Sequence, residues 1–173
     1  MIHKADTTHT ANRPVVYFLH GMESGPNGSK SRALREIMDL QAPDFQGMDI
    51  EERLEKAMSL LAFEENHSVI LIASSLGGLL ATLLWSRMPE KIGGMLLLVP
   101  AWERADLSHI QALHPNTQVI LAEDEEVLSV ESQKEHCRNW KIEPVLVKDT
   151  HRLGGNLEII KKAAIEVCAA CRD

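Results

Sequence analysis

The ten residues VILIASSLGG, at positions 69–78, decide the fold that this sequence predicts. The first five, Val69–Ala73, are apolar and rich in β-branched side chains, which indicates a buried strand. After two serines the chain enters Leu76–Met88, whose pattern is that of a helix ended by a proline. A serine on so sharp a strand-to-helix turn exposes its hydroxyl, and the turn needs small residues two positions before and after it. Ala73 and Gly77 meet this need, so Ser75 is the candidate nucleophile.

Two details of this turn bear on that assignment. The usual residue at the first small position is glycine, so Ala73 is a departure that adds one Cβ atom. Ser74 is a competing serine, but it lacks small residues at both flanking positions. The alternative is a turn rich in serine and glycine that has no catalytic role.

Further apolar strands and helices alternate along the rest of the chain, and this alternation predicts βαβ units with a parallel sheet. Continuously apolar strands indicate that helices cover both faces of the sheet. The predicted fold class is therefore α/β, a three-layer α/β/α sandwich with a mostly parallel sheet of about six strands. We expect a flexible tail at 1–13 and one domain at 14–173. The other expected strands are Val15–Leu19, a short one within Ala42–Met48, Met95–Val99, Val119–Ala122 and Val145–Lys148; the other expected helices are 31–40, 50–65, 105–113, Ser129–Trp140 and Asn156–Cys171.

Composition excludes some functions. The net charge of -7 argues against nucleic-acid binding, which calls for a basic face. No apolar run approaches the roughly 18 residues that span a bilayer, and the N-terminus lacks the apolar core of a signal peptide. Three cysteines fit a reducing compartment, so we expect a cytoplasmic protein. We expect no cofactor and no metal, because Cys137 has no ligand-spaced partner and Cys168 and Cys171 fit one helix face. The oligomeric state is left open.

A serine needs a base, and His151 is the best candidate. It follows the last predicted strand within the loop 149–155, which places it at the same sheet edge as Ser75. The other histidines fit less well, because they lie in the tail, before the nucleophile, or on or beside predicted helices: His3, His9, His67, His109, His114 and His136. His20 is expected to be structural.

The acid that orients this histidine should follow the strand before last, where the chain reads Glu-Asp-Glu-Glu at 123–126. Asp124 is the first choice because its Asp-x-x-Val spacing matches the way this loop usually turns back into the next helix. Glu123 is the next choice, and Glu125 and Glu126 stay open. Glu103 and Asp106 are a more distant option, and a charge run of this kind can also simply face water.

A reaction through a tetrahedral intermediate needs two backbone N–H donors. One is the amide of Leu76, at the positive end of its helix. The other is expected in the loop after the first strand, from the amide of Met22, which follows His20 and Gly21.

Over nearly the whole chain these residues resemble the α/β-hydrolase superfamily. The run FLHGMESGPNGSK at 18–30 and the segment APDFQGMD at 42–49 are similar to a small bacterial branch, that of YqiA-type esterases. The elbow Ser-Ser-Leu-Gly-Gly also resembles that of depalmitoylating hydrolases of mitochondria. The resemblance implies hydrolysis of a carboxylic ester or thioester, a small-molecule substrate.

The resemblance also shows which parts of larger members have no room here. The sequence lacks length for a large lid between residues 100 and 116, so we expect an open, shallow site. Gly21, Met22 and Trp102 are expected to line it. Phe45 could line it too, but core packing suits it better. Lys30 and Asp44 could touch a charged substrate group, although capping and solvent exposure explain them as easily.

The function that the sequence predicts is thus a serine hydrolase with Ser75, His151 and Asp124 as nucleophile, base and acid. Two alternatives come from the same fold. One is a binding protein without catalysis, since fold alone does not give function. The other is different chemistry at the same serine, as in a perhydrolase or a carbon–carbon hydrolase.

Overall fold

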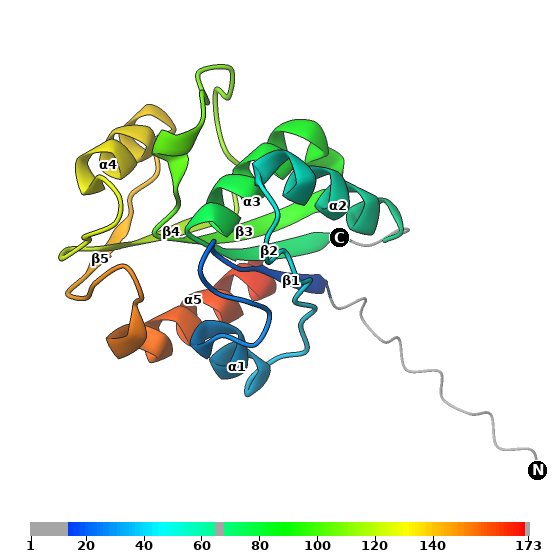
Figure 1. Ribbon diagram of the computed structural model, residues 1–173, viewed down its shortest axis with the longest axis horizontal. Helices are drawn as coiled ribbons and strands as arrows, with labels where there is room; N and C mark the ends of the chain where they lie inside the picture. The colour runs from blue at the N-terminus through cyan, green and yellow to red at the C-terminus, as the bar shows by residue number, and fades with distance from the viewer. Residues whose placement is uncertain (1–13, 65–67, 172–173) are drawn as a thin grey trace, which may run out of the picture.

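The structure is a computed structural model that describes residues 14–64 and 68–171. Residues 1–13, where we expect a flexible tail, lie outside that range. A five-stranded parallel sheet forms the centre, and its strands are ordered as they follow in the chain (Figure 1). The strands are β1 (Val15–Leu19), β2 (Val69–Ser74), β3 (Ile92–Leu98), β4 (Thr117–Ala122) and β5 (Val145–Val147).

Helices cover both faces of this sheet, which confirms the predicted three-layer α/β architecture (Figure 1). One face carries α2 (Ile50–Ala62), α3 (Leu76–Arg87) and α4 (Val130–Asn139); the other carries α1 (Ser29–Arg35) and α5 (Leu157–Ala170). Short 3-10 turns complete the connections: η1 (Pro89–Lys91), η2 (Trp102–Arg104) and η3 (Gly154–Asn156).

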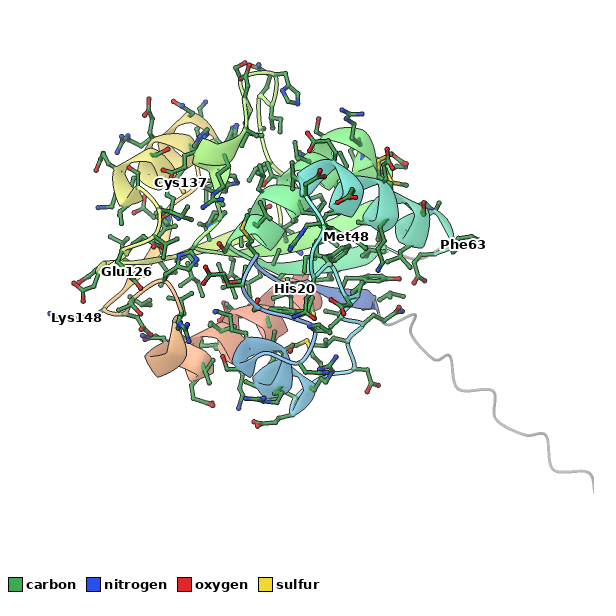
Figure 2. The ribbon with its side chains drawn as sticks, viewed as in Figure 1. His20, Met48, Phe63, Glu126, Cys137 and Lys148 are labelled. Atoms are coloured by element: carbon green, nitrogen blue, oxygen red, sulfur yellow. The ribbon has the colours of Figure 1, made fainter. Side chains whose placement is uncertain are left out.

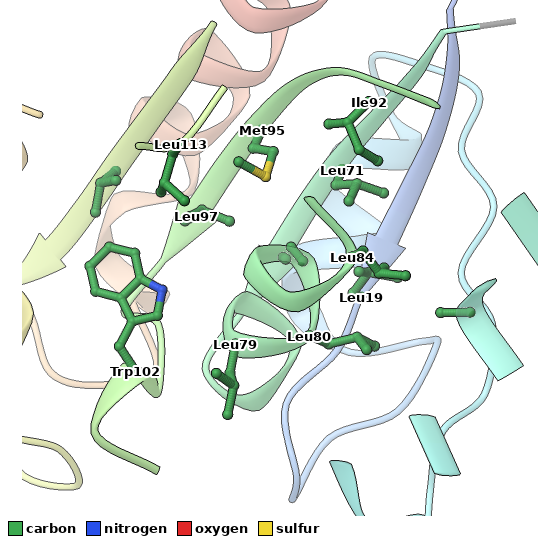
Figure 3. Packing of buried hydrophobic residues seen from close by; sticks show 14 of the residues in the cluster. Leu19, Leu71, Leu79, Leu80, Leu84, Ile92, Met95, Leu97, Trp102 and Leu113 are labelled. Atoms are coloured by element: carbon green, nitrogen blue, oxygen red, sulfur yellow. The ribbon is translucent and has the colours of Figure 1, made fainter. Parts of the chain in front are cut away.

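The core divides into two clusters because successive side chains of a strand point to opposite faces. In β1, Val16 and Phe18 join the cluster under α1 and α5, whereas Tyr17 and Leu19 join the cluster under α2 and α3. Figure 3 shows the second cluster, in which leucines of α3 pack on β1, β2 and β3. All six residues of β2 are buried. The strand that leads to Ser75 is therefore fixed on both faces.

Two predicted elements are absent from the described residues. Residues 42–48 form no strand: Gln41 makes one isolated bridge to Tyr17, after which Pro43 cannot donate to a ladder and Gly47 turns the chain at φ +75°. Residues 105–113 form no helix, and the 3-10 turn η2 ends just before them at Arg104. The sheet therefore has five strands among the described residues, where we expected about six.

Helix boundaries follow local signals. Asp49 caps α2 with a full capping box, because its carboxylate accepts from the Glu52 N–H and the Glu52 carboxylate accepts from the Asp49 N–H. α1 ends at Arg35, five residues earlier than expected, and the N–H groups of Ile37 and Met38 both turn back to the Leu34 carbonyl.

The first turn of α3 lies very close to neighbouring backbone. A Cβ atom on Gly77 would overlap the carbonyl oxygen of Leu19 at the end of β1, and one on Gly78 would lie 2.8 Å from Cβ of Pro100. Only glycine fits where a helix approaches a strand end this closely. The Gly-Gly pair therefore lets α3 begin directly above the sheet edge.

We predict that Gly77→Ala lowers the free energy of unfolding by about 3 kcal/mol, since a rigid backbone must move to admit the methyl group. The measurement is urea unfolding followed by circular dichroism. Gly154→Ala is the matched control: a Cβ atom there meets nothing within 4 Å, so its effect should stay within about 0.5 kcal/mol. Equal effects of the two substitutions would contradict the steric account.

Candidate active site

Ser75 lies on the turn between β2 and α3 in a backbone conformation that is rare for a residue with a side chain. Its φ is 55° and its ψ is -117°, as a serine on such an elbow requires. Neighbouring backbone holds this strained residue from both sides. Its N–H donates to the Leu98 carbonyl at 2.9 Å, and its carbonyl accepts from the N–H groups of Gly78 at 2.9 Å and Ala101 at 3.0 Å.

His151 is the histidine that reaches this serine. It lies in the loop after β5, and its Nε2 atom is 3.0 Å from the Ser75 hydroxyl oxygen. The sequence placed the two residues at the same sheet edge, and the structure brings them into hydrogen-bond distance. The imidazole is 16 % exposed, so a substrate can approach it from solvent.

The carboxylate behind His151 belongs to Glu125 and not to Asp124. The Glu125 Oε2 atom lies 2.7 Å from Nδ1 of His151, and the Glu125 side chain is fully buried. Asp124 is exposed and contributes its backbone instead, since its N–H donates to the Asp149 carbonyl at 3.0 Å. The expectation that the Asp124 side chain contacts His151 is therefore wrong.

The physical reason lies in how the turn after β4 is built. The Glu125 Oε1 atom accepts from the N–H groups of Val127 at 2.8 Å and Leu128 at 3.1 Å. These bonds fold the longer glutamate side chain back under the loop, which leaves Oε2 free to face the imidazole. The Asp-x-x-Val spacing carries no information about this folding back, and no other sequence signal distinguishes the four carboxylates.

Glu126 makes a second contact to the same histidine that the sequence did not predict. Its Oε2 atom accepts from the His151 backbone N–H at 3.0 Å. Two consecutive glutamates thus bind His151: Glu125 contacts its imidazole ring, and Glu126 accepts from its backbone N–H. Glu103 and Asp106, the more distant acid candidates, instead accept from the N–H groups of Ser129 and Ser108.

His20 is structural, as expected. His20, labelled in Figure 2, is fully buried, and its Nδ1 lies 2.7 Å from the Gly21 carbonyl while its Nε2 accepts from the Phe45 N–H at 2.9 Å. An imidazole that accepts at Nε2 and donates at Nδ1 is neutral. Burial lowers the pKa of His20 below its usual value, in agreement with this tautomer.

The loop after β1 lies directly against the nucleophile. A Cβ atom on Gly21 would lie only 3.3 Å from Cβ of Ser75. Met22, the next residue along this loop, is 55 % exposed. Leu76 is buried in the first turn of α3. The amides of Met22 and Leu76 thus stay our predicted oxyanion donors, and Gly21 stays a predicted lining residue.

Trp102 does not line the site, contrary to the sequence expectation. It is fully buried in the core above the sheet (Figure 3). Its indole N–H donates to the Thr82 hydroxyl at 2.9 Å, and its ring meets Trp140 edge to face at 5.0 Å. A large aromatic residue with its one polar atom satisfied packs as core. Phe45 is likewise buried, which confirms the core alternative for it.

Lys30 and Asp44 occupy different surroundings. Burial lowers the pKa of Lys30 to about 8, and the nearby Asp149 carboxylate partly opposes this shift. Asp44 is exposed and accepts from the Gln46 N–H at 2.9 Å, so a local turn accounts for it.

Within residues 14–64 and 68–171, no cluster of three or more His, Cys, Asp or Glu side chains could hold a metal ion. Over the same ranges no helix is long and apolar enough to cross a bilayer.

Several solved structures are similar to this chain in fold. No protein-family profile and no curated protein sequence matches it. A Xanthomonas campestris protein assigned to the alpha/beta hydrolase superfamily superposes with a TM-score of 0.76 at 24% identity, over 91% of this chain and 99% of that one. Est1E from Butyrivibrio proteoclasticus with bound ferulic acid gives 0.80 at 13% identity, over 91% and 89%. Mouse alpha/beta hydrolase domain-containing protein 10 gives 0.74 at 14% identity, over 90% of each chain.

We predict that Glu125→Gln removes the strongly downfield imidazole proton expected from a Nδ1–H bonded to a carboxylate. Proton NMR of the folded protein provides the measurement. Asp124→Asn is the matched control, because it makes the same chemical change one residue away on an exposed side chain, and it should keep that resonance. The resonance disappearing in Asp124→Asn instead would restore the original assignment.

We predict that buried His20 makes stability depend on pH. The folded-state pKa lies below the unfolded value, so the unfolded chain binds the proton first and stability is lost as pH falls below about 6.5. Urea unfolding at pH 7.5 and 5.5 measures this loss, which for one group is at most about 1.4 kcal/mol per pH unit.

His114 and His136 have lowered pKa values for the same reason, burial, so part of the loss should persist without His20. His20→Gln should therefore show a smaller loss than wild type, and exposed His109→Gln an unchanged one. The same pH dependence in His20→Gln as in wild type would refute the assignment of a neutral buried imidazole.

Proposed function

We propose that this chain is a serine hydrolase that cleaves a carboxylic ester or thioester through Ser75, His151 and Glu125. One observation carries the proposal, namely two consecutive hydrogen bonds from serine to imidazole at 3.0 Å and from imidazole to a buried carboxylate at 2.7 Å. A serine becomes a nucleophile when a base of this kind takes its proton. The neighbours support the proposal, since hydrolases and esterases share the fold.

The reaction proceeds in two acyl transfers. The Ser75 oxygen attacks the carbonyl carbon while His151 Nε2 takes the hydroxyl proton, and the carbonyl oxygen becomes an oxyanion held by the amides of Met22 and Leu76. Collapse expels the alcohol or thiol, which receives the proton from His151. Water then attacks the acyl-enzyme by the same route and releases the acid. Glu125 holds the Nδ1–H tautomer and stabilises the imidazolium.

The surroundings of the serine suit a small or flexible acyl group. Residues 99–116, between β3 and β4, hold η2 and no further helix, so nothing in this connection covers Ser75 as a helical lid would. Met22 and Val127 are 55 % and 52 % exposed and offer apolar contact beside the elbow and beside Glu125. The resemblance to YqiA-type esterases points to a carboxylic ester or thioester as the substrate class.

Ser75→Ala should lower turnover of p-nitrophenyl acetate by on the order of 10⁴-fold or more. Ser74→Ala is the matched control. Because Ser74 is buried in β2, this variant should keep most of the activity. A fluorophosphonate probe should label wild type and Ser74→Ala, and leave Ser75→Ala unlabelled. Folded wild-type protein that neither turns over esters nor takes the label would overturn the proposal in favour of a binding protein.

A further inference from the structure

Arg53 on α2 is a buried cation that the sequence gives no reason to expect. Its side chain is 1 % exposed, in a layer otherwise filled by apolar residues of α2 and α3. Guanidinium groups stay charged in proteins, so burying one is costly unless its donors are satisfied. Arg53 takes part in no ion pair among the described residues. Burial lowers the pKa of Arg53, and the charge of the exposed Asp44 carboxylate opposes this shift.

The donors of Arg53 are satisfied by backbone carbonyls of the loop after β1. Nη1 donates to the His20 carbonyl at 2.9 Å, and both Nη1 and Nη2 lie 3.4 Å from the Gly21 carbonyl oxygen. Nε donates to the Met48 carbonyl at 3.1 Å. Figure 2 labels His20 and Met48, two of the three residues whose carbonyls Arg53 reaches. The guanidinium fork thus spans two consecutive peptide groups next to the proposed nucleophile.

The contacts of Arg53 with two carbonyls also orient the N–H groups of the same two peptides. The His20 carbonyl shares its peptide with the Gly21 N–H, and the Gly21 carbonyl shares its peptide with the Met22 N–H. Both peptides are trans, so each N–H points away from the carbonyl that Arg53 holds. Gly21 lies against Ser75, so the Met22 N–H belongs to a peptide next to the place where an oxyanion on Ser75 would form.

We propose that Arg53 is a positioning residue of the oxyanion hole, which turns the Met22 N–H group toward Ser75 and strengthens it as a donor. The inference rests on the proposed function. A cation bound to a carbonyl oxygen polarises its peptide and makes the N–H of that peptide more positive. The Nδ1–H of His20, 2.7 Å from the same Gly21 carbonyl, adds to this effect. Arg53 itself touches no substrate.

Lys56 provides a matched control on the same helix. Its Nζ atom lies 5.6 Å from the centre of the Phe45 ring, and the Arg53 Cζ atom lies 5.7 Å from it. Its hydrogen bond goes to the Asp44 carbonyl, outside the loop after β1. Lys56→Met therefore removes a cation from the same ring without changing the hold on His20 and Gly21.

The test compares Arg53→Lys and Arg53→Met with Lys56→Met in hydrolysis of p-nitrophenyl acetate and of its thionoester, in which sulfur replaces the carbonyl oxygen. Removing one oxyanion donor costs about 10²–10³ in kcat, so a misdirected donor should cost about 10–100-fold. We expect this loss in kcat for Arg53→Met with KM within about twofold, and a smaller loss for Arg53→Lys. Lys56→Met should match wild type.

The oxygen-to-sulfur ratio of kcat/KM separates this role from general support of the fold. Donors aimed at an oxyanion favour oxygen over the larger, weakly accepting sulfur, so the ratio should fall about tenfold in Arg53→Met. An unchanged ratio in folded Arg53→Lys and Arg53→Met would overturn the inference even if both variants were slow. Wild type without ester turnover or fluorophosphonate labelling would instead refute the proposed function.

A wild-type measurement decides the matter if the variants fail to fold. In a crystal structure of the phosphonyl adduct of Ser75, the phosphoryl oxygen should accept from the Met22 N–H while Arg53 still holds the Gly21 carbonyl. A Met22 N–H that points elsewhere in that adduct would overturn the inference.

Discussion

The close approach of α3 to the ends of β1 and β3 is the constraint on which the rest of the site depends. Gly77 has no room for a side chain above the Leu19 carbonyl, and Gly78 has almost none beside Pro100. Because the helix begins this close to the sheet, Ser75 must take its strained conformation at the sheet edge. The same contact brings the loop that leaves β1 within reach of the serine. The positions of the nucleophile and of the neighbouring loop therefore both follow from the packing of α3 against the ends of β1 and β3.

The remaining groups arrive at that edge through parallel strands. The carboxyl ends of β2, β4 and β5 lie along one side of the sheet, so the loops that follow them carry Ser75, Glu125 and His151 together. Their spacing in the chain is large, since His151 follows Ser75 by 76 positions. Because the sheet is buried on both faces, it holds these loops side by side despite their separation along the chain.

The sequence was informative wherever a local pattern has a single structural solution. The apolar run before Ser75 and the small residues Ala73 and Gly77 around it predict a strand followed by a sharp turn into a helix, and the structure contains both. Residues 42–48 and 105–113 lack such a pattern, and the strand and helix expected there are absent. Asp124 and Trp102 were assigned incorrectly for a related reason. Side-chain direction within a turn or a packed layer depends on tertiary contacts that no spacing records.

The order of the strands has a consequence for how this protein behaves among its own copies. β1 and β5 are the two borders of the sheet. The border at β1 is occupied by Gln41, which exchanges backbone hydrogen bonds with Val16 and Phe18. The border at β5 is only three residues long, and Pro144 directly before it offers no N–H. An invading strand would find too few open partners at either border, which protects an apolar parallel sheet from fibrous self-association.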